Sequence, residues 1–312
     1  MHTIENEMTE LENSLLKDCT LCPRACHVNR LAGAKGFCRK GPAPEAARAA
    51  LHMWEEPCIS GTRGSGAVFF SGCSLHCVYC QNNSIALSGW GRELSHSRLA
   101  EVFLELQAKG AANINLVTAA HFLPSVIQAL KEAKEQGLSI PVVYNSGGYE
   151  SLSSLKLLDG LVDVYLPDLK YLDSRLAEDL SHAPDYPERA KEAIEEMVRQ
   201  TGECMLSSDG YMQKGTMVRH LILPGHTRNA KEVLAYLYHR YQDRIFISLL
   251  SQYTPVMKQT LPGYAELNRT LTAREHEKVM DYAISLGVQN GYYQEQGTAK
   301  ESFIPSFEGE GL

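Results

Sequence analysis

From about residue 66 onward, short apolar runs alternate with longer amphipathic stretches, and this alternation constrains the fold most. Near-continuous apolar strands joined by helical crossovers indicate a parallel sheet covered by helices. Six or seven such units over about 230 residues favour a complete or partial β/α barrel over a short doubly wound sheet. We predict strands at 67–72, 113–118, 140–145, 162–167, 217–224, 244–250 and 290–295, and helices at 96–109, 122–136, 150–158, 185–201, 229–242 and 272–286.

The boundaries of this barrel follow from changes in pattern. Residues 1–64 are predicted to form an N-terminal helix, with Leu11, Leu15 and Leu16 on one side, and a Cys-rich metal-binding module. The barrel is expected over 65–300, with a C-terminal tail over 301–312. Two helix starts carry an N-cap residue with an acidic residue three positions later, Asn229 with Glu232 and Thr272 with Glu275. The stretch KGTMVR after Tyr211 predicts a hairpin insertion.

Charge and composition exclude several classes of protein. The chain has 312 residues, with 30 Lys and Arg against 37 Asp and Glu, for a net charge of −7. Sequence-independent binding to duplex DNA needs a surplus of basic side chains, so no nucleic-acid partner is expected. No run of 18 apolar residues occurs, and the acidic start of the chain is unlike a secretory signal or transit peptide. We therefore expect a cytoplasmic protein without a membrane partner.

The nine cysteines are not distributed like a disulfide framework. Thiols stay reduced in the cytoplasm, and seven of the nine lie in two tight groups. Cys58 and Cys204 stand alone. Clustered thiols at gaps of two or three residues favour metal or iron–sulfur ligation over packing. The groups are Cys19, Cys22, Cys26 and Cys38, and then Cys73, Cys77 and Cys80.

The second group follows the first predicted strand, in GCSLHCVYCQN, with the spacing Cys73-x3-Cys77-x2-Cys80. Three thiolates on one short loop can bind three corners of a [4Fe–4S] cluster and leave one iron for a ligand that is not protein. A structural zinc site or a ferredoxin would normally supply four protein ligands. The loop therefore predicts a cluster with one open iron, and no catalytic residue is assigned beyond it.

This spacing, with Tyr79 just before the last cysteine and a strand just before the loop, resembles the radical S-adenosylmethionine (radical SAM) superfamily. The resemblance implies that S-adenosylmethionine (SAM) chelates the open iron through its amino and carboxylate groups. It also implies reductive cleavage of SAM to methionine and a 5′-deoxyadenosyl radical, which abstracts hydrogen from a substrate. A low-potential donor such as flavodoxin or ferredoxin would supply the electron.

Three further segments resemble the branch typified by pyruvate formate-lyase activating enzyme. They are VYNSGGYE (143–150), VYLPDLKYLD (164–173) and VRHLILPGH (218–226). For Lys170 and Arg219, barrel-mouth salt bridges are the alternative to cofactor contact. By the resemblance, the residues that bind SAM or approach its cluster are Tyr79, Asn145, Ser146, Gly147, Asp168, Lys170 and Arg219.

One segment departs from the family pattern. The family's Gly-Gly-Glu element, which orients the methionine amine, follows the second strand. This chain has VTAAHFLP there instead. Thr118 and His121 are the candidates to replace the missing contacts, and we include His121 among the cofactor-binding residues. A lone histidine at a strand end is as often structural as functional.

The first cysteine group has the spacing Cys19-x2-Cys22-x3-Cys26-x11-Cys38, a complete set of four ligands. It resembles an N-terminal extension found in a poorly characterised group of activase-like radical SAM proteins. A structural zinc ion and a second iron–sulfur cluster both use four thiolates, so both assignments stay open. A metal-free Cys-rich loop is the third possibility.

The substrate is open between two hypotheses. An activase would install a glycyl radical on a partner enzyme, as the similarity around Asp168 and Lys170 implies. Alternatively, the enzyme would modify a small molecule or another protein side chain. A non-catalytic iron–sulfur or zinc protein for electron transfer or assembly belongs to a different class, and the three-cysteine loop argues against it.

Overall fold

The computed structural model describes residues 10, 13–87, 89–255, 261–294 and 305–312. In these ranges a ten-stranded sheet has the order β10-β9-β8-β6-β5-β4-β2-β1-β3, and β7 pairs with β8 alone. All pairs from β2 to β10 along this order are parallel, whereas β1 runs antiparallel to β2 and β3. The strands are β1 (Glu45–His52), β2 (Ser65–Phe70), β3 (Arg92–Glu93), β4 (Ile114–Val117), β5 (Val142–Ser146), β6 (Val164–Pro167), β7 (Met205–Leu206), β8 (Met212–Leu221), β9 (Phe246–Leu250) and β10 (Gly291–Tyr293).

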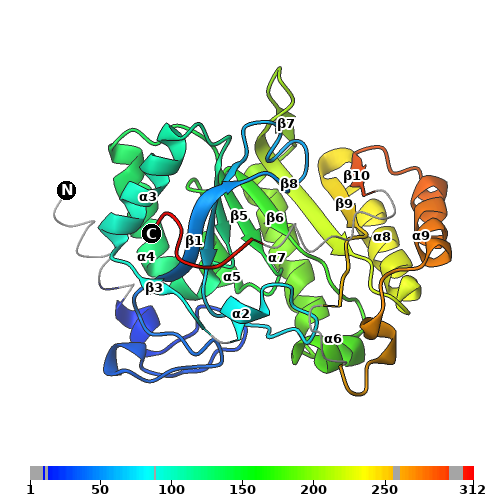
Figure 1. Ribbon diagram of the computed structural model, residues 1–312, viewed down its shortest axis with the longest axis horizontal. Coiled ribbons are helices and arrows are strands. Elements are labelled where there is room, and N and C mark those ends of the chain that lie inside the picture. The colour runs from blue at the N-terminus through cyan, green and yellow to red at the C-terminus, as the bar shows by residue number, and fades with distance from the viewer. Residues whose placement is uncertain (1–9, 11–12, 88, 256–260, 295–304) are drawn as a thin grey trace.

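Helices cover the outer face of this curved sheet, and its two edges do not meet (Figure 1). The predicted α/β fold, a partial β/α barrel, is therefore confirmed. The α-helices are α2 (Asn83–Ala86), α3 (His96–Ala108), α4 (Leu123–Glu135), α5 (Leu152–Lys156), α6 (Ser174–Ser181), α7 (Tyr186–Thr201), α8 (Thr227–Tyr241) and α9 (Ala273–Leu286). Short 3-10 helices occur at Arg30–Ala32, Ala120–Phe122, Gln242–Arg244 and Ala265–Asn268.

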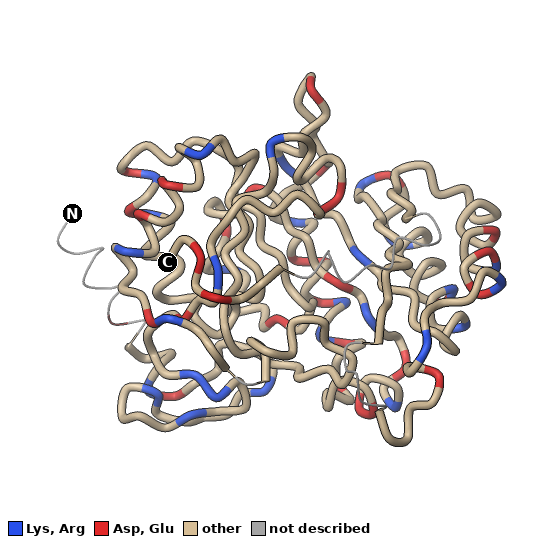
Figure 2. Tube along the Cα trace, viewed as in Figure 1, with Lys and Arg blue, Asp and Glu red and all other residues tan. Residues whose placement is uncertain are grey.

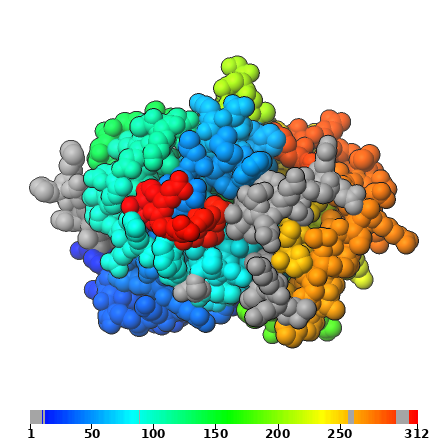
Figure 3. Space-filling view, viewed as in Figure 1, coloured from blue at the N-terminus to red at the C-terminus, as the bar shows by residue number. Residues whose placement is uncertain are grey.

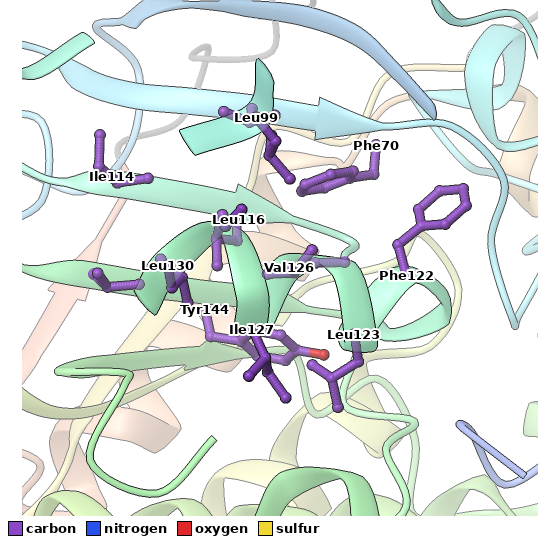
Figure 4. Packing of buried hydrophobic residues seen from close by; sticks show 14 of the residues in the cluster. Phe70, Leu99, Ile114, Leu116, Phe122, Leu123, Val126, Ile127, Leu130 and Tyr144 are labelled. Carbon is purple, nitrogen blue, oxygen red and sulfur yellow. The ribbon is translucent and has the colours of Figure 1, made fainter. Parts of the chain in front are cut away.

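The core between sheet and helices explains why the strands read as continuous apolar runs. Every residue of β2, β4, β5 and β6 is buried. Figure 4 shows Val126 and Leu130 of α4 near the strand side chain Leu116, and Ile127 beside Tyr144 of β5. Strands buried on both faces lose the polar alternation of a half-exposed sheet.

The structure tests two predicted helix caps and one predicted hairpin. The capping box at Thr272 and Glu275 is confirmed, because each side chain bonds the other residue's backbone N–H. The N-cap prediction at Asn229 is wrong, since α8 begins at Thr227. The Asn229 amide instead donates to the Lys170 carbonyl oxygen and accepts from the Leu172 N–H, which ties α8 to the loop after β6. The hairpin is formed by β7 and β8.

The sheet begins at Glu45, inside the range predicted for the Cys-rich module, because β1 pairs with β2. Residues 13–17 are helical, and Leu15 and Leu16 pack on the core, whereas Leu11 lies outside the described residues. At the other end of the chain, 305–312 runs along β1 and lies on the face seen in Figure 3. No helix in the described ranges has the length and apolarity needed to cross a membrane.

Candidate active site

The three-cysteine loop, residues 73–80, leaves the carboxyl end of β2. Cys77 is buried and Cys73 and Cys80 are half-buried. The loop is held from outside the strand, since the Val78 N–H donates to the carbonyl oxygen of Leu180 at the end of α6 (2.9 Å). His76, next to Cys77, has a left-handed backbone (φ 55°), which is uncommon for a residue other than glycine. The loop is therefore a fixed turn.

Hydrogen bonds reach two of its sulfur atoms. The Leu75 N–H donates to Cys73 Sγ (3.4 Å), and the Ser181 hydroxyl donates to Cys77 Sγ (2.9 Å). Ser181 is also bonded to the Tyr171 hydroxyl (2.9 Å), which donates to Tyr79 (2.6 Å). Tyr79 thus lies in a buried chain of hydroxyl groups that ends on a cysteine of the loop.

A cavity of about 240 Å³ opens between this loop and the carboxyl ends of β4, β5, β6, β8 and β9. Carboxyl ends of parallel strands are where β/α barrels place their chemistry. Three cysteines line it, and the other polar lining groups of the described residues are oxygen and nitrogen donors or acceptors. A [4Fe–4S] cluster with one iron left for a non-protein ligand fits this donor set. Of the predicted SAM residues, the cavity is lined by Tyr79, Asn145, Ser146, Gly147, Asp168, Lys170 and Arg219.

The charged groups of the cavity form one network. Asp168 accepts from Lys170 Nζ (2.5 Å) on one oxygen and from Arg219 Nε (3.0 Å) on the other. Burial alone would raise the pKa of Asp168, but the two cations outweigh burial and hold the pKa below its usual value. Arg219 also donates to Asn145 Oδ1 (2.6 Å). Lys170 and Arg219 therefore form salt bridges and also line the cavity, so the salt bridges do not remove these side chains from it.

Glu55 completes the network and was not predicted from the sequence. It lies in the connection between β1 and β2, accepts from Arg219 Nη1 (3.2 Å) and lines the cavity. Asn115 and Asn145 donate to its other oxygen (3.1 and 3.3 Å). The only sequence signal for Glu55 was the pair of acidic residues in MWEEP. Acidic residues in a loop between strands usually lie on the surface, so this signal did not indicate a site residue.

In VTAAHFLP, the segment that departs from the family pattern, the structure places the two candidates Thr118 and His121 in different surroundings. Thr118 lines the cavity with a left-handed backbone (φ 62°), which is a marked outlier for a β-branched residue. His121 is buried outside the cavity lining, with Nε2 2.7 Å from the Ser71 carbonyl oxygen. The structure therefore does not bring His121 to the cavity with the other predicted residues, because the chain turns into a 3-10 helix after Ala119.

His121 gives a pH-dependent prediction. A carbonyl oxygen only accepts, so Nε2 carries the proton, and the buried Nδ1 has no hydrogen-bond partner. Burial first, and then Arg30 and Lys40, lower the pKa of His121 to about 3. The unfolded chain therefore binds a proton below pH 6.5 that the folded chain does not. His121 should cost about 2 kcal/mol of stability between about pH 6.5 and 5.

Urea unfolding at both pH values, for the natural protein and His121→Gln, measures this effect. The variant should lose less stability on acidification and bind SAM as before. A weakened SAM affinity would instead place His121 in the cofactor site.

Ser181 gives a prediction for the redox potential. A hydroxyl that donates to a cluster sulfur stabilises the more negative, reduced state. For a cluster held by the three-cysteine loop, Ser181→Ala should therefore lower the midpoint potential by about 20 to 60 mV, the equivalent of one hydrogen bond. Redox titration followed by electron paramagnetic resonance (EPR) measures it. Ser65→Ala, a buried serine bonded to Asn113 at the start of β2, should leave the potential unchanged.

The four cysteines of residues 19–38 lie at the same end of the sheet, next to the three-cysteine loop (Figure 1). Cys19 and Cys38 are buried, and Cys22 and Cys26 are half-buried. In the described part of the chain, no group of three or more His, Cys, Asp or Glu side chains is arranged to hold one metal ion. That statement covers both cysteine groups.

Comparison with known proteins agrees with this site. A family model described as the Radical SAM superfamily matches residues 67–237, more than half of the chain. An uncharacterized protein of Methanocaldococcus jannaschii is 28% identical over 281 residues, which cover 88% of this chain and 76% of that protein.

Solved structures are similar over part of their length. Streptococcus suis SuiB bound to S-adenosylmethionine matches 72% of this chain and 48% of its own at 16% identity, with a TM-score of 0.49, so the chain spans about half the length of SuiB. A domain of pyruvate-formate lyase-activating enzyme from Bacteroides vulgatus matches 55% of this chain and 91% of its own at 14% identity, with a TM-score of 0.38. The matched residues include most of β2, the three-cysteine loop and the carboxyl ends of β4, β5, β6 and β8 at the cavity, and the protein belongs to the radical SAM superfamily.

Proposed function

We propose that Cys73, Cys77 and Cys80 hold a [4Fe–4S] cluster whose open iron binds SAM, and that the enzyme takes a hydrogen atom from a glycine in a partner protein. The observation that carries the proposal is the cavity itself, where three thiols face a polar wall built from five strand ends. When bound, the cluster and SAM supply a one-electron cleavage that yields methionine and a 5′-deoxyadenosyl radical.

The residues of the chain would orient SAM and exclude water. An ammonium group has three N–H donors, and Asp168 accepts one from Lys170, so the others can bind a carboxylate. Asn145 is fixed at both ends of its amide by Arg219 and Glu55, so its position is set before a ligand arrives. Leu75 and Tyr79 are buried and form an apolar part of the cavity wall. Preorganised polar groups in a dry cavity are what such a reaction requires.

The exposed rim of the cavity suits a macromolecular substrate. The substrate would reach the radical across the open rim, as a loop of a partner protein can. Trp54, with 55% of its surface exposed, lies on the cavity lining and would meet such a loop.

A deuterium-transfer experiment tests the substrate class. The reconstituted, reduced protein is incubated without oxygen with SAM and a peptide whose central glycine carries deuterium on Cα. One C–D bond breaks and one forms, so we expect deuterium in 5′-deoxyadenosine. The glycyl EPR signal should be a doublet when the peptide carries hydrogen on Cα, and it should collapse to a narrow single line when that position carries only deuterium. Formation of 5′-deoxyadenosine without deuterium would exclude the glycine substrate and favour a small molecule or another side chain. Flavodoxin or ferredoxin is the proposed electron donor.

A further inference from the structure

The segment 19–40, which we call the four-cysteine segment, contacts the three-cysteine loop directly. The Arg24 side chain donates to the carbonyl oxygens of Ser74 (2.8 Å), Ser181 (3.2 Å) and His182. The Phe37 ring stacks on the His76 ring, with 4.4 Å between centroids. Two cysteine groups that are far apart in sequence thus share one contact region.

The two backbones approach each other closely one residue before Cys73. A Cβ atom on Gly72 would lie 2.8 Å from the Cys38 carbonyl oxygen, which is closer than real Cβ contacts, and Gly72 has a left-handed φ of 86°. Only glycine lets the Cys38 backbone pass so close. Cys38 and Cys73 are therefore neighbours across this contact.

Backbone amides are directed at the sulfur atoms in both groups. The Phe37 N–H donates to Cys26 Sγ (3.3 Å). The three-cysteine loop has a comparable bond, from the Leu75 N–H to Cys73 Sγ (3.4 Å). Donors to sulfur favour the thiolate, which is the form that binds metal.

The backbone beside these cysteines is held in unfavourable conformations. Ala25 (φ 38°) and His27 (φ 52°) flank Cys26, and Arg39 (φ 60°) follows Cys38. Left-handed backbone costs an L-residue other than glycine roughly 1–2 kcal/mol. His76 has the same conformation beside Cys77. Backbone strain of this kind clusters where a fold positions ligands, and it is common to both cysteine groups.

The charge of this segment is suited to an anionic group. Residues 19–44 contain five Lys and Arg and no Asp or Glu, in a chain of net charge −7. Figure 2 shows this concentration of blue at the lower left, over the segment. Arg30 is 1% exposed, its Nη1 lies 4.0 Å from Cys19 Sγ, and its Nε has no hydrogen-bond partner. A buried cation without a full set of partners is costly unless an anion lies nearby.

From these contacts we infer that Cys19, Cys22, Cys26 and Cys38 hold a second iron–sulfur cluster, next to the first and able to exchange an electron with it. A single zinc ion would bring four sulfur atoms to about 2.3 Å from one point. Among the described residues, no group of three or more His, Cys, Asp or Glu side chains has such an arrangement. The thiolates of a [4Fe–4S] cluster would each bind a separate iron atom, so they need not converge on one point. The four thiolates complete the ligand set, so this cluster has no open iron.

The electron-transfer part of the inference rests on the proposed function, whereas the metal part does not. A low-potential protein donor would be oxidised by one electron, the second cluster reduced and reoxidised, and the first cluster reduced. Exposed Lys35 and Arg39 place positive charge on the outer side of the segment, which suits an acidic donor.

Metal content of the variant Cys73/Cys77/Cys80→Ala tests the second cluster without any need for SAM cleavage. We expect about four iron and four sulfide per chain and an EPR signal on reduction. Adding Cys26→Ser should remove them, while adding Cys204→Ser, a cysteine remote from both groups, should not. One zinc per chain, or no metal in a folded triple variant, would overturn the inference.

Spin coupling tests the proximity. In the fully reduced natural protein, two neighbouring clusters should give a broadened EPR spectrum, unlike the sum of the spectra from the triple variant and from Cys26→Ser. If Cys26→Ser does not fold, Cys22→Ala replaces it. A spectrum equal to the sum would show that the clusters are too far apart for direct exchange. Loss of SAM cleavage with both results intact would refute only the proposed function.

Discussion

Replacing Cys77 with alanine should abolish the formation of 5′-deoxyadenosine, to the level seen without protein. Cys77 is the buried member of the loop, and its sulfur accepts the Ser181 hydrogen bond. Two remaining thiols cannot hold three corners of a cluster, so the iron that binds SAM is lost. Iron content should fall by about four atoms per chain. Liquid chromatography of the nucleoside and iron analysis measure both effects.

A cysteine outside the two groups is the matched control. Cys204 is half-buried and bonded to the Thr216 carbonyl oxygen (3.5 Å), away from the cavity lining. Cys204→Ser should keep both iron and activity. Equal product from Cys77→Ala and the natural protein would mean that the loop does not hold the reactive cluster.

Replacing Arg219 with methionine should destabilise the protein by about 3 to 5 kcal/mol, the usual effect of breaking a buried ion pair from one side. The guanidinium bridges Asp168 (3.0 Å) and Glu55 (3.2 Å), and only 14% of its side chain is exposed. Asp168 keeps Lys170, but Glu55 loses its cation and stays buried among amides. Burial already raises the pKa of Glu55, so its protonation would recover part of the loss at low pH.

Urea unfolding at neutral pH measures this loss. Arg228→Met is the matched control, because that side chain is 92% exposed and is paired with Glu232 one helical turn away. It should leave the midpoint unchanged. If Arg219→Met were as stable as the control, the network would be no more than a surface arrangement of charges.

Much of the barrel could be predicted because its strands are buried on both faces. Seven apolar runs correspond to β2, β4, β5, β6, β8, β9 and β10. β1 was missed, since EAARAALH has neither a continuous apolar run nor a regular alternation. Alanine favours helix locally, and pairing with β2 overrides that preference. α6 was missed because it is only eight residues long, and its N-cap Asp173 is the last residue of the VYLPDLKYLD segment.

The candidate site also has a part that the sequence predicts and a part that it does not. Cys73 and Asp168 follow strands, and Asn145 and Arg219 lie near the carboxyl ends of β5 and β8, so the topology alone brings these residues to one edge of the sheet. Glu55 and the contacts of Arg24 come from irregular connections, whose paths depend on tertiary packing. His121 is three residues beyond Thr118, and a left-handed turn there directs the chain away from the cavity. No periodicity in the sequence encodes such a turn.

The central claim is that this protein cleaves SAM with an electron from the three-cysteine loop's cluster. The most direct measurement is product analysis after anaerobic reconstitution and reduction with dithionite. We predict equal amounts of methionine and 5′-deoxyadenosine, formed only with reduced protein and SAM together. A protein with intact cluster absorbance that forms neither product above the Cys77→Ala background would contradict the claim.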